Sequence, residues 1–206
     1  MVFSLVNNIK RIILKKVKKQ SFPIENVQIG KGTILNGKFR LVATKYSKII
    51  IGKYCAIANG LKIITINHDY NYPAIQGTFY REFFNDIDHP GVTKEPPNKE
   101  RTKGDVIIGN DVWIGEDVFI TSGTKVGNGC CIAAKSVVTK DLESYSIYAG
   151  VPAKFIKKRF NEEVIKFLEN QKWWDWSEKK IRANKKFFST NLNDLKDLKK
   201  IEINFE

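Results

Sequence analysis

The chain is short of the residues that mark several common protein classes. It has only three cysteines in 206 residues, and two of them, Cys130 and Cys131, are adjacent. An odd count with an adjacent pair does not suit a disulfide framework, so the thiols are expected to be reduced packing residues. The sequence also lacks a run of 18 or more apolar residues and a secretory cleavage pattern. These absences predict a cytoplasmic protein.

Patterns for metal and nucleic-acid binding are also missing. The sequence has two histidines, and its acidic residues are scattered without ligand spacing, so no metal site is expected. Acidic residues number 22 against 35 lysines and arginines, a net charge of +13. The basic residues cluster in 10–19, 154–159 and 179–200, without a zinc-ligand or helix-turn-helix pattern. A phosphorylated cofactor or an anionic membrane surface therefore explains this charge better than a nucleic acid.

What the sequence does have is a six-residue period. The aliphatic positions of this period are Ile29, Leu35, Leu41, Ile51, Ile57, Ile63, Ile108, Ile114, Ile120, Val126, Ile132 and Val138. In the later hexads the next residue is always Gly, Ala or Thr. A period of six suits three short strands per coil of a β-solenoid, each sending one aliphatic side chain inward and joined by tight turns. An ordinary β-sandwich is the alternative, but twelve such matches arise by chance with a probability on the order of 10⁻⁵.

Other segments interrupt or flank the predicted β-helix, which spans 23–154. The hexads stop after Ile63 and resume at Val106, so the insert must leave and re-enter the solenoid as a projecting arm, over 69–105. An aliphatic stripe among lysines predicts a basic amphipathic helix over 1–22. The region 155–206 has helical periodicity, with Ser177 as a predicted N-cap, and is expected to cover the open end of the solenoid.

The hexads, a histidine just inside the arm, the run DVWIG (111–115) and the later AGVPAK (149–154) together resemble the hexapeptide-repeat acyltransferases. The xenobiotic acetyltransferase subgroup is the most similar, because WWDWSEKKIRAN (173–184) also resembles its C-terminal helix. The resemblance implies a mainly β protein with a left-handed parallel β-helix, acetyl-CoA as co-substrate, and a homotrimer with active sites between neighbouring solenoids. NHDYNYP and GTFYREFF depart from the subgroup's pattern after the histidine, and Lys135 replaces a common glycine, so the acceptor is expected to differ from its antibiotics.

Acetyl transfer from a thioester needs a base for the attacking group and a donor for the developing oxyanion. The resemblance assigns the base to His68, and an imidazole suits this role near neutral pH. Alternatively, His68 is a surface loop histidine. For His89, in the turn-like DIDHPG, a structural role is favoured. The resemblance places the oxyanion donor at the backbone N–H of Glu116, whose side chain is alternatively no more than a solvated turn carboxylate.

Coenzyme A carries phosphates, so basic side chains and free backbone donors are expected at one end of its cleft. By motif position, the candidates for contacts with the cofactor are Trp113, Ala134, Ser136, Thr139, Lys140, Lys154 and Lys157. Alternatively, each lysine is a solvated surface charge and the tryptophan packs within the trimer. Aromatic faces suit a sugar ring, and the arm offers Tyr70, Tyr72, Phe79, Tyr80 and Phe83 as an acceptor-binding wall. These rings alternatively bury the base of the arm against a neighbouring subunit.

The sequence thus predicts an acetyl-CoA-dependent O-acetyltransferase that modifies a sugar hydroxyl of a bacterial surface polysaccharide or its precursor. Three alternatives stay open: inactivation of an antibiotic by O-acetylation, N-acetylation of a nucleotide-linked amino sugar, and a non-catalytic trimeric scaffold. A scaffold would need neither His68 nor the lysines beside AGVPAK. The helix over 1–22 favours peripheral contact with the inner face of the membrane, or alternatively packs on the trimer.

Overall fold

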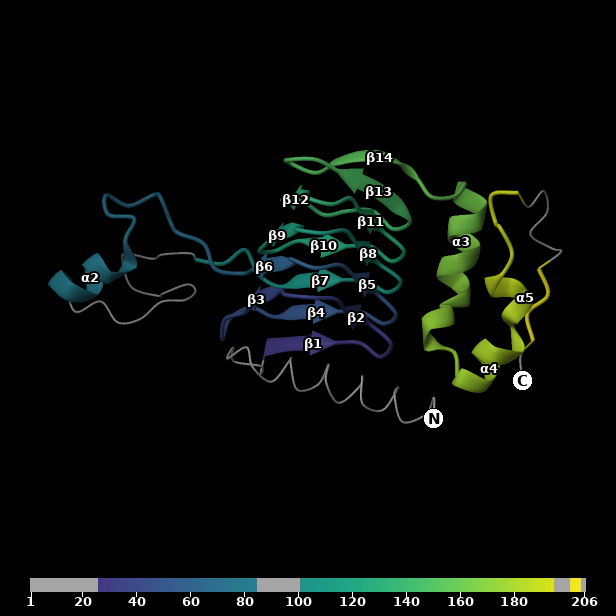
Figure 1. Ribbon diagram of the computed structural model, residues 1–206. Coiled ribbons are helices and arrows are strands. Elements are labelled where there is room, and N and C mark those ends of the chain that lie inside the picture. Colours follow the sequence, from purple (N-terminus) through teal and green to yellow (C-terminus); the bar gives the residue numbers. More distant parts are fainter. Residues whose placement is uncertain (1–25, 85–100, 195–200, 205–206) are drawn as a thin grey trace.

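The computed structural model describes residues 26–84, 101–194 and 201–204 (Figure 1). Within these ranges no helix combines the length and the apolar character that crossing a bilayer requires. The helix predicted over 1–22 and the histidine at position 89 lie outside the described residues, so their predicted roles stay predictions.

Fourteen short strands form three sheets, and each coil adds one strand to each sheet (Figure 1). The first sheet contains β1 (Val27–Ile29), β4 (Ile49–Ile51), β7 (Val106–Ile108) and β10 (Lys125–Val126). The second contains β2 (Ile34–Leu35), β5 (Ala56–Ile57), β8 (Trp113–Ile114), β11 (Cys131–Ile132), β13 (Ser146–Ala149) and β14 (Lys154–Lys158). The third contains β3 (Arg40–Val42), β6 (Lys62–Ile64), β9 (Phe119–Thr121) and β12 (Val137–Val138). All pairings are parallel except that of β13 with β14, so the predicted parallel β-helix is confirmed.

The predicted inward positions form the core. From Leu41 to Val138, each predicted aliphatic position is buried, and successive coils stack like on like, with Ile57, Ile114 and Ile132 in register in the second sheet. The two earlier positions differ, because Leu35 is half-buried and Ile29 is 44% exposed. Ile29 lies on β1, at the edge of the first sheet, where β4 is the only neighbouring strand among the described residues. An inward side chain needs a coil on both sides to be covered.

Glycine at the corners lets successive turns approach closely. A Cβ atom on Gly52 would lie 2.4 Å from the carbonyl oxygen of Gly109 on the next coil. Backbone atoms cannot move aside as a flexible side chain can, so any other residue would force the two coils apart. Where glycine follows an inward aliphatic residue, as at Gly52, its presence therefore follows from the spacing of the coils as well as from the turn.

The repeat is interrupted where predicted, between β6 and β7, and the arm projects away from the coils (Figure 1). Its described part contains one helix, α2 (Gly77–Phe84). The helices that follow β14 lie on the opposite side of the solenoid, namely α3 (Glu162–Gln171), η2 (Trp173–Asp175), α4 (Glu178–Ala183) and α5 (Lys185–Phe188). The predicted N-cap is confirmed, because the Ser177 side chain accepts a hydrogen bond from Lys180 N.

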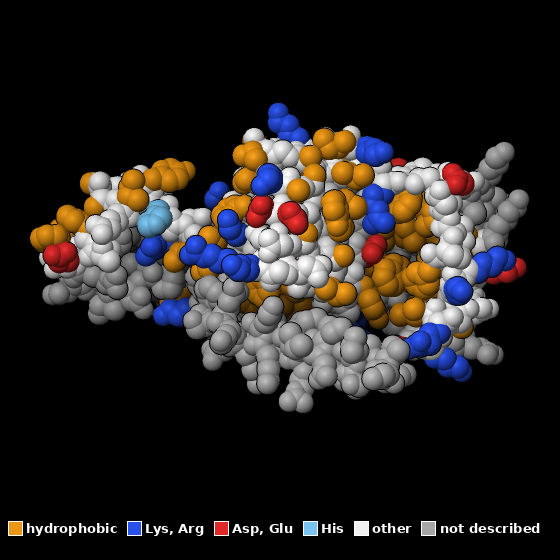
Figure 2. All heavy atoms as spheres, viewed as in Figure 1, with side chains coloured by type: hydrophobic (Ala, Val, Ile, Leu, Met, Phe, Trp, Pro, Cys, Tyr) orange, Lys and Arg blue, Asp and Glu red, His pale blue; other side chains and the backbone are white. Residues whose placement is uncertain are grey.

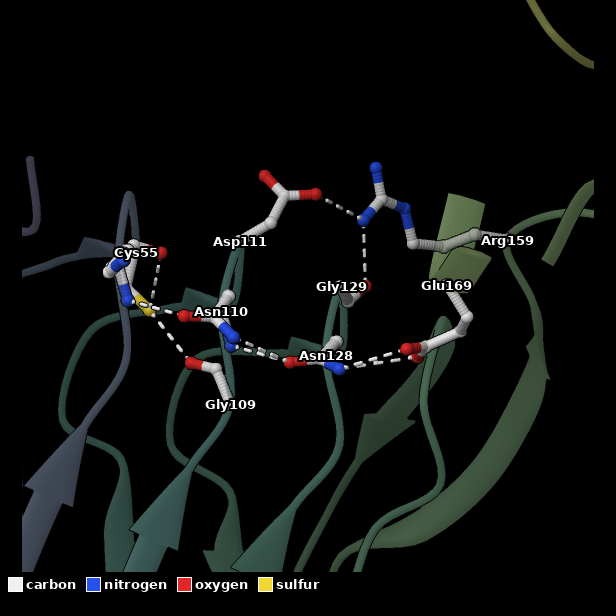
Figure 3. Close-up of polar contacts among 9 residues, drawn as sticks. Cys55, Gly109, Asn110, Asp111, Asn128, Gly129, Arg159 and Glu169 are labelled. Carbon is white, nitrogen blue, oxygen red and sulfur yellow. Dashed lines mark hydrogen bonds and ion pairs between the residues drawn. The ribbon is translucent and has the colours of Figure 1, made fainter. Parts of the chain in front are cut away.

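The prediction that the C-terminal region covers the open end of the solenoid is wrong for these helices. They lie along its side, against the corner between the first and second sheets (Figures 1 and 3). Asn110 donates to Asn128 Oδ1 on the next coil, and Asn128 Nδ2 donates to Glu169 Oε2 of α3 at 3.0 Å. Lower on the same corner, Lys53 pairs with Asp175 of η2. A column of polar turn residues thus provides partners along the side that the end of the solenoid does not offer.

One buried group at this junction leads to a prediction about stability. Tyr145 is 1% exposed, and its hydroxyl has no hydrogen-bond partner among the described residues. Burial raises the pKa of this hydroxyl, and the nearby Glu169 and Asp111 carboxylates raise it further. Tyr145→Phe is therefore expected to leave the free energy of unfolding unchanged or to raise it by up to about 1 kcal/mol, measured by urea unfolding, because no hydrogen bond is lost.

Tyr148→Phe is the matched control for this prediction. The Tyr148 hydroxyl is also on a buried side chain, but it accepts a hydrogen bond from Glu143 N at 3.2 Å. This variant is expected to lower the free energy of unfolding by about 0.5–1.5 kcal/mol. A loss of the same size in Tyr145→Phe would show that its hydroxyl has a partner after all.

Candidate active site

The root of the arm holds His68 next to the coils. The chain leaves β6 through Thr65, whose N–H donates to Val42 O at 3.0 Å, and Asn67 N then donates to Arg101 O of the returning segment at 2.6 Å. Asn67 Nδ2 donates to Ser122 Oγ of the coil at 2.7 Å. His68 follows directly, so hydrogen bonds fix its backbone position relative to both the returning segment and the solenoid.

The His68 side chain is exposed and lines a hollow of about 410 Å³. Figure 2 shows histidine on the surface of the arm, with lysine and arginine side chains between it and the coils. The residues that line the hollow are Asn67, His68, Asp69, Tyr70, Asn71, Thr102 and Lys103. Most of these side chains are polar. The hollow is therefore suited to an acceptor that presents hydroxyl or other hydrogen-bonding groups to the imidazole.

The five aromatic residues predicted as an acceptor wall separate into two groups. Tyr70 is 81% exposed, and Phe79 and Phe83 are exposed on α2. Tyr72 is half-buried, and Tyr80 is buried, with its hydroxyl accepting from Ala74 N at 3.3 Å and its ring edge-on to Phe79. Tyr80 thus packs within the arm of the same chain, which neither interpretation of these rings predicted. Only the exposed rings offer a face to an acceptor.

Glu116 lies at the corner between the second and third sheets, in the turn after β8. Its carbonyl oxygen accepts from Lys135 N of the next coil at 2.7 Å, but its own N–H donates to no group in the described part of the chain. The N–H of Ala134, one coil further on, likewise donates to no described residue. Trp113 stands before this turn, exposed on the outer face of the second sheet and in register with Cys131. The turn therefore has open backbone donors beside an exposed ring.

One protomer does not bring His68 and Glu116 together. The arm leaves the coil between the third and first sheets, whereas Glu116 lies between the second and third sheets, so a full sheet face separates the two corners. The sequence could not show this separation, because it depends on which corner each turn occupies. Any site that uses both groups must take them from neighbouring molecules.

The predicted cofactor residues occupy three places. Ala134 is exposed in the turn above Glu116, Thr139 and Lys140 are exposed after β12, and Lys154 and Lys157 are exposed on β14. None of these three lysines forms an ion pair with another described residue. Ser136 differs, because its side chain is fully buried and its hydroxyl accepts from Gly150 N at 3.2 Å. The Ser136 hydroxyl is thus used inside the coil, which argues against a contact with a ligand.

The cysteines are free thiols, as predicted. Burial raises the pKa of all three and brings that of Cys130 to about 12. A thiol with a raised pKa is protonated near neutral pH and is a poor nucleophile.

In the part of the chain that the structure describes, no cluster of three or more His, Cys, Asp or Glu side chains is arranged to bind a metal. The imidazole of His68 is thus the group at the hollow suited to acid–base chemistry near neutral pH.

Comparison with known proteins identifies the family. The family model described as bacterial transferase hexapeptide (six repeats) matches residues 105–140. Over 139 residues the chain is 48% identical to a probable macrolide acetyltransferase of Lysinibacillus sphaericus, and the match covers 66% of this chain and 74% of that protein. The chain belongs to the hexapeptide-repeat acetyltransferases.

Two further likenesses concern the fold and the relatives of this acetyltransferase. It is 39% identical over 139 residues to a chloramphenicol acetyltransferase of Klebsiella aerogenes, a match that covers 66% of this chain but only 63% of that relative. An N-acyltransferase from Bacillus cereus, solved in complex with dTDP-4-amino-4,6-dideoxyglucose and coenzyme A, matches with a TM-score of 0.51 and 26% identity over 70% of this chain and 69% of that one. The predicted left-handed parallel β-helix is confirmed by this family membership.

Proposed function

We propose that this acetyltransferase transfers an acetyl group from acetyl-CoA to a hydroxyl of a sugar-containing acceptor, with His68 as the general base. The observation that carries the proposal is an exposed imidazole in the wall of a hollow of about 410 Å³, on a backbone that hydrogen bonds of the preceding residue Asn67 anchor at the root of the arm. Acetyl-CoA, when bound, supplies the acetyl group as a thioester. His68 takes the proton from the acceptor hydroxyl as its oxygen attacks the thioester carbonyl. His68 then returns that proton to the departing sulfur.

The backbone N–H of Glu116 is the proposed donor to the developing oxyanion. An N–H that is unused in the free protein and fixed by a tight turn stabilises negative charge without reorganisation. The support is that this N–H donates to no described residue, although the turn is otherwise anchored by the bond from Lys135 N. The Glu116 side chain is exposed and has no role in this scheme.

We propose that the protein works as a homotrimer. His68 and Glu116 lie at different corners of one protomer, so the arm of one subunit must meet the Glu116 corner of a neighbour. The outer face of the second sheet offers a surface for this contact. Ile34 and Trp113 are exposed there, and strand register places Ala56 between them. Burial of such a stripe is a common driving force for subunit association.

A sugar hydroxyl fits the hollow better than a largely apolar acceptor, because the lining is mostly polar and includes the exposed ring of Tyr70. We therefore favour a surface polysaccharide or its precursor as the acceptor. An antibiotic hydroxyl is the second candidate, favoured by the names of the macrolide and chloramphenicol relatives.

Release of free thiol from acetyl-CoA tests these acceptors. The panel contains simple and nucleotide-linked sugars, an amino sugar, a polysaccharide preparation, a macrolide, a streptogramin and chloramphenicol. Thiol release only with the antibiotics would replace the first candidate by the second, and release only with an amino sugar would replace O-acetylation by N-acetylation. Binding of CoA without turnover on any acceptor would favour the scaffold.

The double variant Lys140→Ala/Lys154→Ala is expected to weaken CoA binding by about 10- to 100-fold, because each ammonium group is proposed to form a charge-assisted hydrogen bond to a phosphate. The value of kcat at saturating acetyl-CoA should change little, since neither lysine takes part in the proposed proton transfer. Titration of CoA by calorimetry measures the affinity. Lys166→Ala/Lys185→Ala removes two exposed lysines from α3 and α5 as a charge-matched control. Equal affinities in the two double variants would refute the assignment.

A further inference from the structure

The turn residue Ser122 is buried, as are Ala43 and Thr65 at the equivalent position after Leu41 and Ile63. It occupies the second position after the inward residue Ile120, as Glu116 follows Ile114 and Lys140 follows Val138. Glu116 and Lys140 are exposed, whereas Ser122 is 4% exposed. This burial arises where the root of the arm contacts the corner between the third and first sheets.

The Ser122 hydroxyl joins both segments of the arm root to the coil. Its oxygen accepts a hydrogen bond from Asn67 Nδ2 of the outgoing segment at 2.7 Å and another from Lys103 N of the returning segment at 3.3 Å. A hydroxyl has two acceptor lone pairs, so one oxygen can serve both donors. Asn67 and Lys103 also line the hollow that contains the imidazole.

The next residue, Gly123, lets the returning segment approach this closely. Its φ is +75°, and its N–H donates to Gly104 O at 3.1 Å. A Cβ atom at this position would lie 2.5 Å from the carbonyl oxygen of Lys103, which is backbone and cannot move without displacing the segment. Ser122 supplies the hydrogen bonds and Gly123 the space, so the two residues act on the same contact.

We propose that Ser122 is a positioning residue of the transferase, which together with Gly123 fixes the arm root and thereby sets the location of the His68 imidazole. The inference rests on the proposed role of His68. Ser122 itself touches neither acceptor nor cofactor in this scheme. A misplacement of a catalytic group by about 1 Å can lower a rate by about 100-fold, so a loosened root should be visible in turnover.

The test combines steady-state kinetics with amide hydrogen exchange measured by mass spectrometry. Ser122→Ala is expected to lower kcat by about 10- to 100-fold with the KM for acetyl-CoA unchanged, and to speed exchange in peptides covering 65–69 and 101–105 only. Ser122→Thr, which keeps the hydroxyl, should restore much of kcat. Gly123→Ala should lower kcat with the hydroxyl intact. The double variant Asn67→Ala/Ser122→Ala should reduce kcat by less than the product of the two single reductions, because both substitutions break the same contact.

Ser146→Ala is the matched control, because the Ser146 hydroxyl is also fully buried and donates to Ser144 O, away from the arm. It should resemble Ser122→Ala in thermal stability and the wild type in kcat. The inference is overturned if Ser122→Ala keeps normal kcat, or if its kcat falls without faster exchange at the arm root. Failure of the proposed function gives a different result, namely normal kcat in His68→Ala whatever Ser122→Ala does.

Discussion

Replacing His68 by alanine is expected to lower kcat by about 10²- to 10⁴-fold, the range for loss of a general base. The imidazole is exposed in the wall of the polar hollow, and within the part of the chain that the structure describes it is the only histidine. Affinity for CoA should remain near normal, since the proposed phosphate contacts lie on β14 and after β12. Thiol release at saturating acetyl-CoA gives kcat, and calorimetric titration gives the affinity.

His89→Ala is the matched control for this variant. It removes the other imidazole of the chain, which the sequence places in a turn-like context, so near-normal turnover is expected. Near-normal turnover in His68→Ala would remove His68 from the role of base. An equal loss of kcat in both variants would show that histidine replacement acts through stability rather than through proton transfer. In that case the melting temperatures of both variants would be lowered.

The period of six was sufficient to predict the coils because one physical requirement repeats along the chain. Every inward slot from Leu41 to Val138 holds a buried aliphatic side chain, so each hexad is an independent test of the same prediction. The hexad pattern could not predict that Ile29 is exposed. A slot at the edge of a stack has the same sequence as a central one, and only the number of neighbouring coils differs.

The candidate site was less predictable from sequence, because its residues are defined by which corner they occupy. Ser136 takes the fifth position of its hexad and Ala134 the third, and of these two only the third position is exposed, so Ser136 was a poor candidate for a ligand contact. The fifth position is buried in the neighbouring hexads as well, at Val112, Val118, Thr124 and Cys130. Ser122 could not be singled out from the sequence, since its contacts with Asn67 and Lys103 depend on the arm folding back over it. A serine directly before a glycine, in a hexad that three more hexads follow, has no property that marks a contact with a distant insert.

Replacing Ile114 by alanine is expected to lower the free energy of unfolding by about 2–5 kcal/mol, the range for deleting buried aliphatic atoms and leaving a cavity. Ile114 is fully buried between Ile57 and Ile132, so a cavity there removes contacts with the coils on both sides. Urea unfolding measures the loss. Ile114→Val should lose only about 0.5–1.5 kcal/mol.

Leu35→Ala places the same deletion at the end of the same column. Leu35 is half-buried and is paired with Ile57 on one side only among the described residues. In a solenoid each repeat contacts only its neighbours, so stability is close to a sum of nearest-neighbour terms, and a terminal slot contributes one interface where a central slot contributes two. The loss in Leu35→Ala should therefore be about half that in Ile114→Ala or less. Equal losses would mean that a further part of the chain covers the first coil as completely as another coil would.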